Sequence, residues 1–331
     1  MVDVNISMGV SQKEPFSRFT EILTLLDRSG IDGVWLIDSQ QTMKDPYVAM
    51  SLAAEHTDTI DIGPGVTNPV TRHETVTANA ISGIKELSGG RARLGIGNGD
   101  SAVKPIDRDP ASMAELADTV RNIRSLVEER SVTYEDDEFE FKKPVGHVPI
   151  YIAASGPKML EMAGDLGDGV IIMSVANEKI ISKKLERIRK GAKKQGQDLD
   201  DLELDLWVTM SAKEDEQSAI NDVKSWCAGH ARFLQRRDEL PESLEKHRDE
   251  MEAAADAYNY SEHLSLSSEH GEIISDELAQ KLAVAGTPAH CVERLQEFDD
   301  LGIDQITISL LSGDREQRIR TIDDTIIPGL N

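Results

Sequence analysis

Three segments rich in glycine and other small residues carry the groups that could do chemistry. They span residues 62–68, 94–100 and 152–158, and in each the polar residues follow an apolar run. Asp38 has the same kind of position, after the apolar run that begins at Gly33. Glycine lets a backbone approach a ligand closely. These positions therefore predict a site for a flat or phosphate-bearing ligand.

The first segment reads Ile-Gly-Pro-Gly-Val-Thr-Asn from Ile62. Its two glycines and its proline, together with Pro69 directly after it, restrict an otherwise β-branched run, which favours a backbone placed against a ligand, although a shaped turn is the alternative. Arg72 and His73 follow where the next helix is expected. A helix N-terminus attracts anions, but His73 could equally cap or pack there.

The second segment reads Leu-Gly-Ile-Gly-Asn-Gly-Asp from Leu94. A dinucleotide-binding fingerprint has a third glycine at a fixed spacing, follows the first strand and opens a helix. This segment lacks that glycine and follows the fourth expected strand instead. A glycine loop that admits the face of a ring is the functional interpretation. A plain turn is the alternative.

The third segment reads Ile-Ala-Ala-Ser-Gly-Pro-Lys from Ile152 and opens directly into a helical pattern. Backbone N–H groups and the positive end of the helix could hold a phosphate there, with a hydrogen bond from Ser155. An ordinary turn is the alternative. Asp38 is either a candidate catalytic carboxylate or the cap of the next helix. No GxSxG, HExxH or phosphate-loop motif is present, and no metal site is implied.

The elements that must position these residues alternate along the whole chain. Eight short β-branched runs are separated by segments of helical period, which predicts an α/β fold, a closed parallel (β/α)8 TIM barrel, rather than the open doubly wound sheet that is its alternative. The strands are expected at residues 2–10, 33–38, 60–66, 92–97, 149–154, 169–175, 202–210 and 305–311. The helices are expected at residues 15–29, 46–55, 74–87, 111–129, 157–166 and 178–195.

Two insertions interrupt this alternation, after strands four and seven, within one predicted domain of residues 1–331. Residues 131–148 alternate aromatic and acidic side chains, which predicts a hairpin. Residues 226–285 are polar and helix-forming and include Tyr258, Asn259 and Tyr260. Long insertions of this kind can cover an active site or join a dimer.

Composition excludes several partners. The chain of 331 residues has 60 acidic and 36 basic residues and a formal net charge of -24, which repels nucleic acid and anionic membranes. Cys227 and Cys291 have no disulfide or metal-ligand spacing. No apolar run approaches the length of a membrane span, and no leader sequence is evident at the start. A cytoplasmic protein is expected.

Taken in order, these segments resemble the luciferase-like flavin and deazaflavin oxidoreductases. The resemblance rests on residues 62–73, 94–100, 151–157 and 167–170, and extends to Gly286-Thr287-Pro288. The branch that matches best is that of the methylenetetrahydromethanopterin reductases. Several motifs in one order are far more specific than any single motif.

This resemblance implies a barrel that binds coenzyme F-420, a deazaflavin, or in other branches FMN. In the family, the segment matching Gly65-Val66 forms a non-proline cis peptide behind the ring. Asp38 matches an acidic residue at the end of strand two and is implied to be one of the cofactor-binding residues, with Gly65 and Val66. The residues implied to line the ring are Thr67, Asn68, Gly97 and Asn98. The residues implied to hold the phosphate are Ala154, Ser155 and Gly156.

The chain departs from the family at two places. Ser39 follows Asp38 where many relatives have histidine, and residues 7–10 lack the acidic residue that pterin reductases tend to carry. Three functions therefore stay open: F-420-dependent hydride transfer to or from a small organic substrate, an FMN-dependent monooxygenase served by a separate flavin reductase, and a non-catalytic flavin-binding barrel. Relatives commonly pair, so a homodimer is expected.

Overall fold

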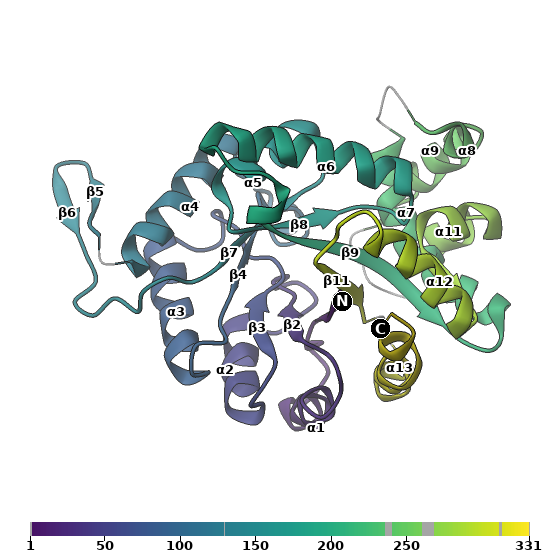
Figure 1. Cartoon of the computed structure of the whole chain (residues 1–331), viewed down its shortest axis with the longest axis horizontal. Helices are drawn as coiled ribbons and strands as arrows, with labels where there is room; N and C mark the ends of the chain where they lie inside the picture. Colours follow the sequence, from purple (N-terminus) through teal and green to yellow (C-terminus); the bar gives the residue numbers. More distant parts are fainter. Residues whose placement is uncertain (1, 129, 236–239, 260–267, 311–312, 331) are drawn as a thin grey trace. The chain divides into compact units, whose positions relative to one another are not determined.

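The chain forms the predicted (β/α)8 barrel (Figure 1). A computed structural model describes residues 2–128, 130–235, 240–259, 268–310 and 313–330. In these residues the barrel strands follow the order β3-β2-β1-β11-β9-β8-β7-β4. The N–H of Ile62 donates to the backbone oxygen of Arg91, and the N–H of Arg93 donates to that of Ile62, each at 2.9 Å, which joins β3 to the residues just before β4. The strands are β1 (Asp3–Met8), β2 (Gly33–Leu36), β3 (Asp61–Pro64), β4 (Leu94–Ile96), β7 (Ile150–Ala154), β8 (Gly169–Met173), β9 (Glu203–Ala212) and β11 (Gln305–Ser309).

The chain divides into two compact units. The first comprises residues 5–172 and 186–205, and the second comprises residues 1–4, 173–185 and 206–331. All the candidate site residues of the sequence analysis belong to the first unit. All eight predicted strands are present, with ends shifted by a few residues. The predicted ends at Glu129 and Leu311 lie outside the described residues.

The helices of the first unit begin where capping groups allow. Asp45 accepts hydrogen bonds from the backbone of Tyr47 and Val48, and Ser112 and Glu115 form a capping box. These helices are α1 (Phe16–Leu26), α2 (Pro46–His56), α3 (Glu74–Leu87), α4 (Met113–Val127) and α5 (Pro157–Leu166). Helix α6 (Glu178–Ala192) has residues in both units. The first unit also contains three short 3-10 helices: η1 (Lys104–Ile106), η2 (Lys193–Gln195) and η3 (Leu199–Asp201).

Trp35 fills the interior of the first unit. Its indole N–H donates to the buried carboxylate of Asp205 at 2.8 Å, and the guanidinium of Arg93 lies 4.0 Å from the ring centroid. A Cβ atom on Gly63 would lie 2.5 Å from this ring, and one on Gly95 would lie 3.0 Å from it. Gly63 is therefore required by the packing of Trp35, which corrects the ligand-facing interpretation at that position.

The predicted hairpin is confirmed between α4 and β7. Strands β5 (Val132–Tyr134) and β6 (Asp137–Phe139) pair in antiparallel register, and the hairpin projects from the helices of its unit (Figure 1). The hairpin contacts the start of α3 through Tyr134, the residue next to its turn, whose hydroxyl donates to Glu74 at 2.8 Å.

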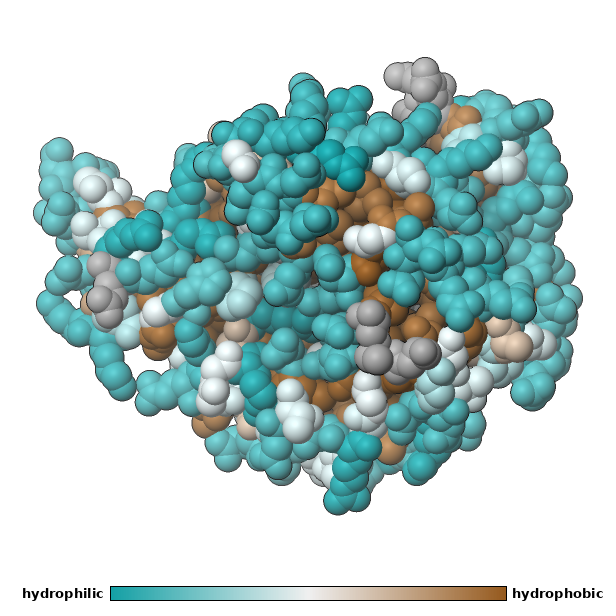
Figure 2. Space-filling view, in the orientation of Figure 1, coloured by the Kyte–Doolittle hydropathy of each residue, from teal (hydrophilic) through white to brown (hydrophobic). Residues whose placement is uncertain are grey.

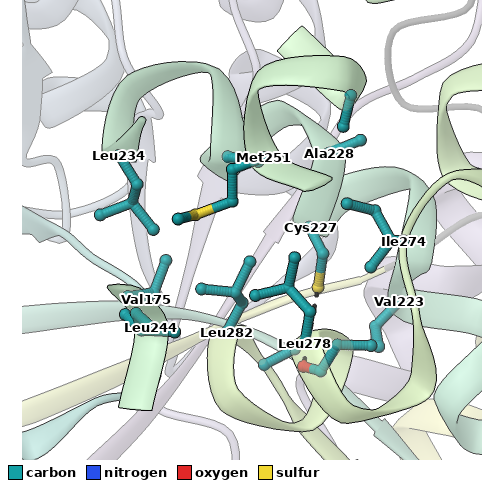
Figure 3. Close-up of a cluster of buried hydrophobic side chains, with 14 of the residues drawn as sticks. Val175, Val223, Cys227, Ala228, Leu234, Leu244, Met251, Ile274, Leu278 and Leu282 are labelled. Atoms are coloured by element: carbon teal, nitrogen blue, oxygen red, sulfur yellow. Dashed lines mark hydrogen bonds between the residues drawn. The ribbon is translucent and has the colours of Figure 1, made fainter. Parts of the chain in front are cut away.

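The second unit holds the helices that follow β9, and the apolar faces of α7, α8, α9 and α11 belong to one buried cluster. Figure 3 shows side chains from α7, α9 and α11 directed toward one another, with the thiol of Cys227 donating to the backbone oxygen of Ala279 at 3.8 Å. The elements are α7 (Glu216–Leu234), α8 (Glu242–Glu245), α9 (Arg248–Asp256), α10 (Glu269–Glu272), α11 (Asp276–Leu282), β10 (Val284–Gly286), α12 (Pro288–Asp299), α13 (Arg315–Thr321), the π-helical turn η5 (Ile322–Ile326) and α14 (Ile327–Leu330).

Secondary-structure elements cross both predicted bounds of the second insertion, at about 226 and 285. Trp226 lies inside α7, which begins ten residues earlier, at Glu216. Strand β10 was not predicted, although Val284 pairs with Met210 of β9 in parallel register. Three residues are too few to establish a period, so the sequence carries no signal for this strand. Tyr260, part of the predicted aromatic cluster, lies outside the described residues.

Candidate active site at the ends of three strands

The ends of β2, β3 and β4 lie side by side. The backbone N–H of Thr67 donates to Gly95 at 3.0 Å, and the N–H of Gly97 donates to Thr67 at 2.9 Å. The N–H of Gly65 donates to Leu36 at 2.7 Å. Parallel strands place their C-terminal ends at one edge of the sheet. Residues from three separate motifs therefore meet here.

Asp38 is the charged residue at the centre of this meeting point. It is 7% exposed, and its Oδ2 atom accepts a hydrogen bond of 2.9 Å from the hydroxyl of Thr67, which is 0% exposed. Burial raises the pKa of Asp38, against the opposing effects of the Thr67 hydrogen bond and the charge of Arg72. The alternative that Asp38 caps the next helix is wrong, because Asp45 caps α2.

Asn68 presents an unused donor. Its Oδ1 atom accepts from the backbone N–H groups of Val70 and Thr71, each at 3.0 Å, and from the Thr71 hydroxyl at 3.2 Å. These donors fix the orientation of the amide, since a flipped amide would turn its own NH2 group toward the N–H groups of Val70 and Thr71. The Nδ2 atom is buried and has no hydrogen-bond partner in the described structure. A buried amide donor without a partner is costly, so this atom fits a ligand acceptor.

The backbone beside Asn68 forms the surface that the resemblance implies. The Gly65-Val66 peptide bond is cis. A Cβ atom on Gly97 would lie 3.2 Å from Cγ2 of Val66 and 3.5 Å from Cβ of Ala153. A larger residue at position 97 would therefore occupy the space beside Val66. Asn98 is exposed, and its backbone oxygen accepts from Ala111 at 2.8 Å.

The turn between β7 and α5 follows Ala154. Ala154 is buried at the end of β7, Ser155 is exposed, and Gly156 is the residue before α5. Gly156, the N-cap residue of α5, has no side chain to cap the helix, and a Cβ atom on it would meet nothing within 4 Å. A helix N-terminus attracts anions, so the phosphate site stays a prediction at this turn.

Arg72 and Tyr47 lie close enough to Asp38 for their charges to interact, and neither was predicted as a site residue. The guanidinium of Arg72 forms an ion pair of 2.5 Å with Asp45 and lies 4.7 Å from the ring centroid of Tyr47. Burial and the nearby charge of Asp38 raise the pKa of the Tyr47 hydroxyl. Nothing in the local sequence marks Tyr47, because it lies at the start of an ordinary apolar helix. His73 caps α3, with Nδ1 accepting from Thr75 at 3.3 Å.

A cleft of about 620 Å³ opens beside Asp38. Its volume suits a small organic ligand. The residues that line it include Asp38, Gln40, Val70, Arg72, Ile106 and Arg108.

Known proteins resemble the chain over almost its whole length. The family model described as luciferase-like monooxygenase matches residues 2–305. A 5,10-methylenetetrahydromethanopterin reductase of Archaeoglobus fulgidus is 33% identical, covering 92% of this chain and 93% of that protein. An F420-dependent glucose-6-phosphate dehydrogenase of Intrasporangium calvum is 24% identical, with 92% of each chain covered.

The solved structures support the same fold. The coenzyme F420 dependent tetrahydromethanopterin reductase from Methanopyrus kandleri superimposes with a TM-score of 0.80 at 23% identity. The superposition covers 100% of this chain and 99% of that structure. The strands and helices of the two proteins therefore follow one architecture.

Proposed function

Because the chain belongs to the luciferase-like monooxygenase family, we propose that it is an oxidoreductase that uses coenzyme F-420 to transfer hydride to or from a small organic substrate. Two of the relatives above support the coenzyme, since the solved reductase from Methanopyrus kandleri and the glucose-6-phosphate dehydrogenase of Intrasporangium calvum are both named as F420-dependent. The reaction resembles that of the methylenetetrahydromethanopterin reductases, and the substrate itself stays open.

The observation that carries this proposal is the unpartnered Nδ2 atom of Asn68, set beside the cis Gly65-Val66 peptide and the glycine at position 97. A flat ring placed against this backbone would satisfy the buried donor. The residues proposed to surround the ring are Gly65, Val66, Thr67, Asn68, Gly97 and Asn98. The residues proposed to hold the phosphate are Ala154, Ser155 and Gly156.

The bound deazaflavin supplies a carbon that accepts or donates hydride. The protein's own contribution is orientation, the exclusion of water and control of one proton. Asp38 is proposed as the catalytic carboxylate, because its raised pKa suits a group that holds a proton near the reacting atoms. Thr67 would fix the direction in which Asp38 presents its free oxygen.

A titration of the purified protein with F-420 and FMN, each oxidised and reduced, tests the proposal by fluorescence and absorbance. Preferential binding of F-420, followed by its oxidation or reduction with added substrate, is the expected result. Preference for reduced FMN with oxygen uptake would instead make the protein a monooxygenase that depends on a separate flavin reductase. Failure to bind either compound, or binding without turnover, would support a non-catalytic barrel.

We also propose that the protein is a cytoplasmic homodimer and that residues 1–331 form one domain. Within the described residues, no helix combines the length and apolar character needed to cross a membrane. Sedimentation equilibrium should give twice the chain mass of 36.4 kDa. A single unfolding transition, with and without coenzyme, is expected if the two compact units behave as one domain.

A further inference from the structure

We propose that the cleft beside Asp38 binds the anionic group of the substrate, a carboxylate or a phosphate, and that Arg108 selects for it. The existence of a substrate rests on the proposed function, whereas the anion site rests on the cleft alone. Three features carry the inference: an arginine whose side chain has no partner in the described structure, a second arginine held by Asp45 and Tyr47, and apolar side chains that line the same cleft.

Arg108 is an exposed arginine in the loop before α4, between Asp107 and Asp109. Its side chain lines the cleft and makes no hydrogen bond or ion pair with the chain as far as the structure describes it. The nearest acidic residue in sequence on its C-terminal side, Asp109, is paired instead with Lys104 at 3.1 Å. A guanidinium with five free donors suits carboxylate or phosphate oxygens.

The loop that carries Arg108 is held in place at its base. The backbone N–H of Ala111 donates to Asn98 at 2.8 Å, and the N–H of Arg108 donates to Val103 at 3.3 Å. The amide of Gln40 also donates to the backbone of Ala102 at 2.6 Å. Arg108 therefore extends from a defined backbone, which lowers the entropy lost when it binds a ligand.

Arg72 adds a fixed donor to the same cleft. Asp45 and the ring of Tyr47 hold its guanidinium, and its Nε atom is buried without a partner in the part of the chain that is described. Because Asp45 compensates the charge of Arg72, the net attraction for an anion comes from Arg108. Asp38 lines the same cleft and repels an anion. The anionic end of the substrate must therefore face Arg108, which leaves its reacting end toward Asp38.

The positively charged arginines of the cleft contrast with the overall negative charge of the chain. The chain carries a net charge of -24, and hydrophilic residues cover most of the face shown in Figure 2. Such a surface disfavours anions in general. Val70 and Ile106, the latter 50% exposed, add apolar surface to the cleft. The expected ligand is thus an organic anion with an apolar portion, rather than inorganic phosphate alone.

Benzoate and benzamide form a matched pair of probes, since they share an apolar ring and differ in charge. We expect the coenzyme-free protein to bind benzoate about tenfold more tightly than benzamide in ligand-observed NMR titrations. Arg108→Gln should abolish this preference. Arg121→Gln, which removes an arginine of α4 that is 57% exposed and paired with Asp118, should retain it. Equal binding of the two probes, or an unchanged preference in Arg108→Gln, would overturn the proposal.

A second measurement separates the substrate from the coenzyme, whose own tail is acidic. Both variants are titrated with F-420 and with its deazaflavin chromophore lacking the phosphate and tail. If F-420 leaves benzoate bound and Arg108→Gln leaves F-420 affinity unchanged, the anion site serves the substrate. If F-420 displaces benzoate and Arg108→Gln weakens F-420 but not the chromophore, Arg108 serves the coenzyme and the proposal is wrong. Benzoate preference without any F-420 binding would reject the proposed coenzyme and still support the anion site.

Discussion

The hydroxyl of Thr67 donates a hydrogen bond of 2.9 Å to the carboxylate of Asp38, from the end of one barrel strand to the end of its neighbour. Both side chains are buried. The bond orients one carboxylate oxygen and favours the ionised form, against the effect of burial. Asp38 is thus held by a partner that the local sequence around it does not reveal.

Replacing Thr67 by valine should remove this bond with little change in volume. We expect the pKa of Asp38 to rise further and the free energy of unfolding to fall by about 1.5–3 kcal/mol, the range for hydrogen bonds to charged groups. Urea unfolding and NMR titration of the Asp carboxyl carbons measure the two effects. Thr67→Ser, which retains the hydroxyl, is the control, and equal behaviour of the two variants would show that the bond contributes nothing.

Asp38→Asn should change how stability depends on pH. Burial raises the folded pKa of Asp38 above the model value of 3.8, so the folded state holds this proton more tightly than the unfolded state. The associated stability is present below pH 3.8 and is lost as pH rises through the folded pKa. The variant should therefore gain stability relative to the natural protein between about pH 4 and neutrality. Thermal melts across this range measure the difference, and a constant offset would contradict the raised pKa.

Asn68→Asp removes the unpartnered Nδ2 donor but keeps an oxygen for the donors of Val70 and Thr71. The fold should survive, while F-420 affinity falls by about tenfold or more, because a ligand acceptor would face a carboxylate. Fluorescence titration reports the affinity, and circular dichroism reports the fold. Undiminished binding would exclude Asn68 from the coenzyme site.

Comparing Gly95→Ala with Gly83→Ala separates two effects of a glycine on the free energy of unfolding: the space that a methyl group needs and the backbone entropy of the unfolded chain. A Cβ atom on Gly95 would lie 2.4 Å from the backbone oxygen of Pro64, which cannot move aside alone, so we expect a loss of about 1–3 kcal/mol or more. A Cβ atom on Gly83 meets nothing within 4 Å on an exposed face of α3, so the same change there should stabilise by up to about 1 kcal/mol. Chemical denaturation of both variants tests the opposite signs.

Trp35→Phe keeps an aromatic ring but removes the indole donor to the buried carboxylate of Asp205. We expect a loss of about 1–3 kcal/mol, since a buried acceptor loses a partner. The double variant Trp35→Phe with Asp205→Asn should recover part of this loss. No recovery in that double variant would indicate that ring volume, rather than the hydrogen bond, determines the cost.

The order of elements was determined by the sequence itself. Alternating β-branched runs and helical periods reflect which residues face the interior, and they led to the eight barrel strands and to the β5–β6 hairpin. The same reasoning placed the small-residue segments at strand ends, since parallel strands end at a common edge. Asp38, Thr67 and Gly97 could therefore be expected near one another before any contact was known.

Only the tertiary structure decided which partner each residue has. The sequence could not distinguish Gly63, which makes room for Trp35, from Gly97, which leaves space beside Val66. It could not pair Arg72 with Asp45, 27 positions away, or leave Arg108 unpaired in the same cleft. Such contacts depend on strand register and on the packing of side chains far apart in the chain. Periodicity records burial alone, so it contains no information about which two distant residues meet.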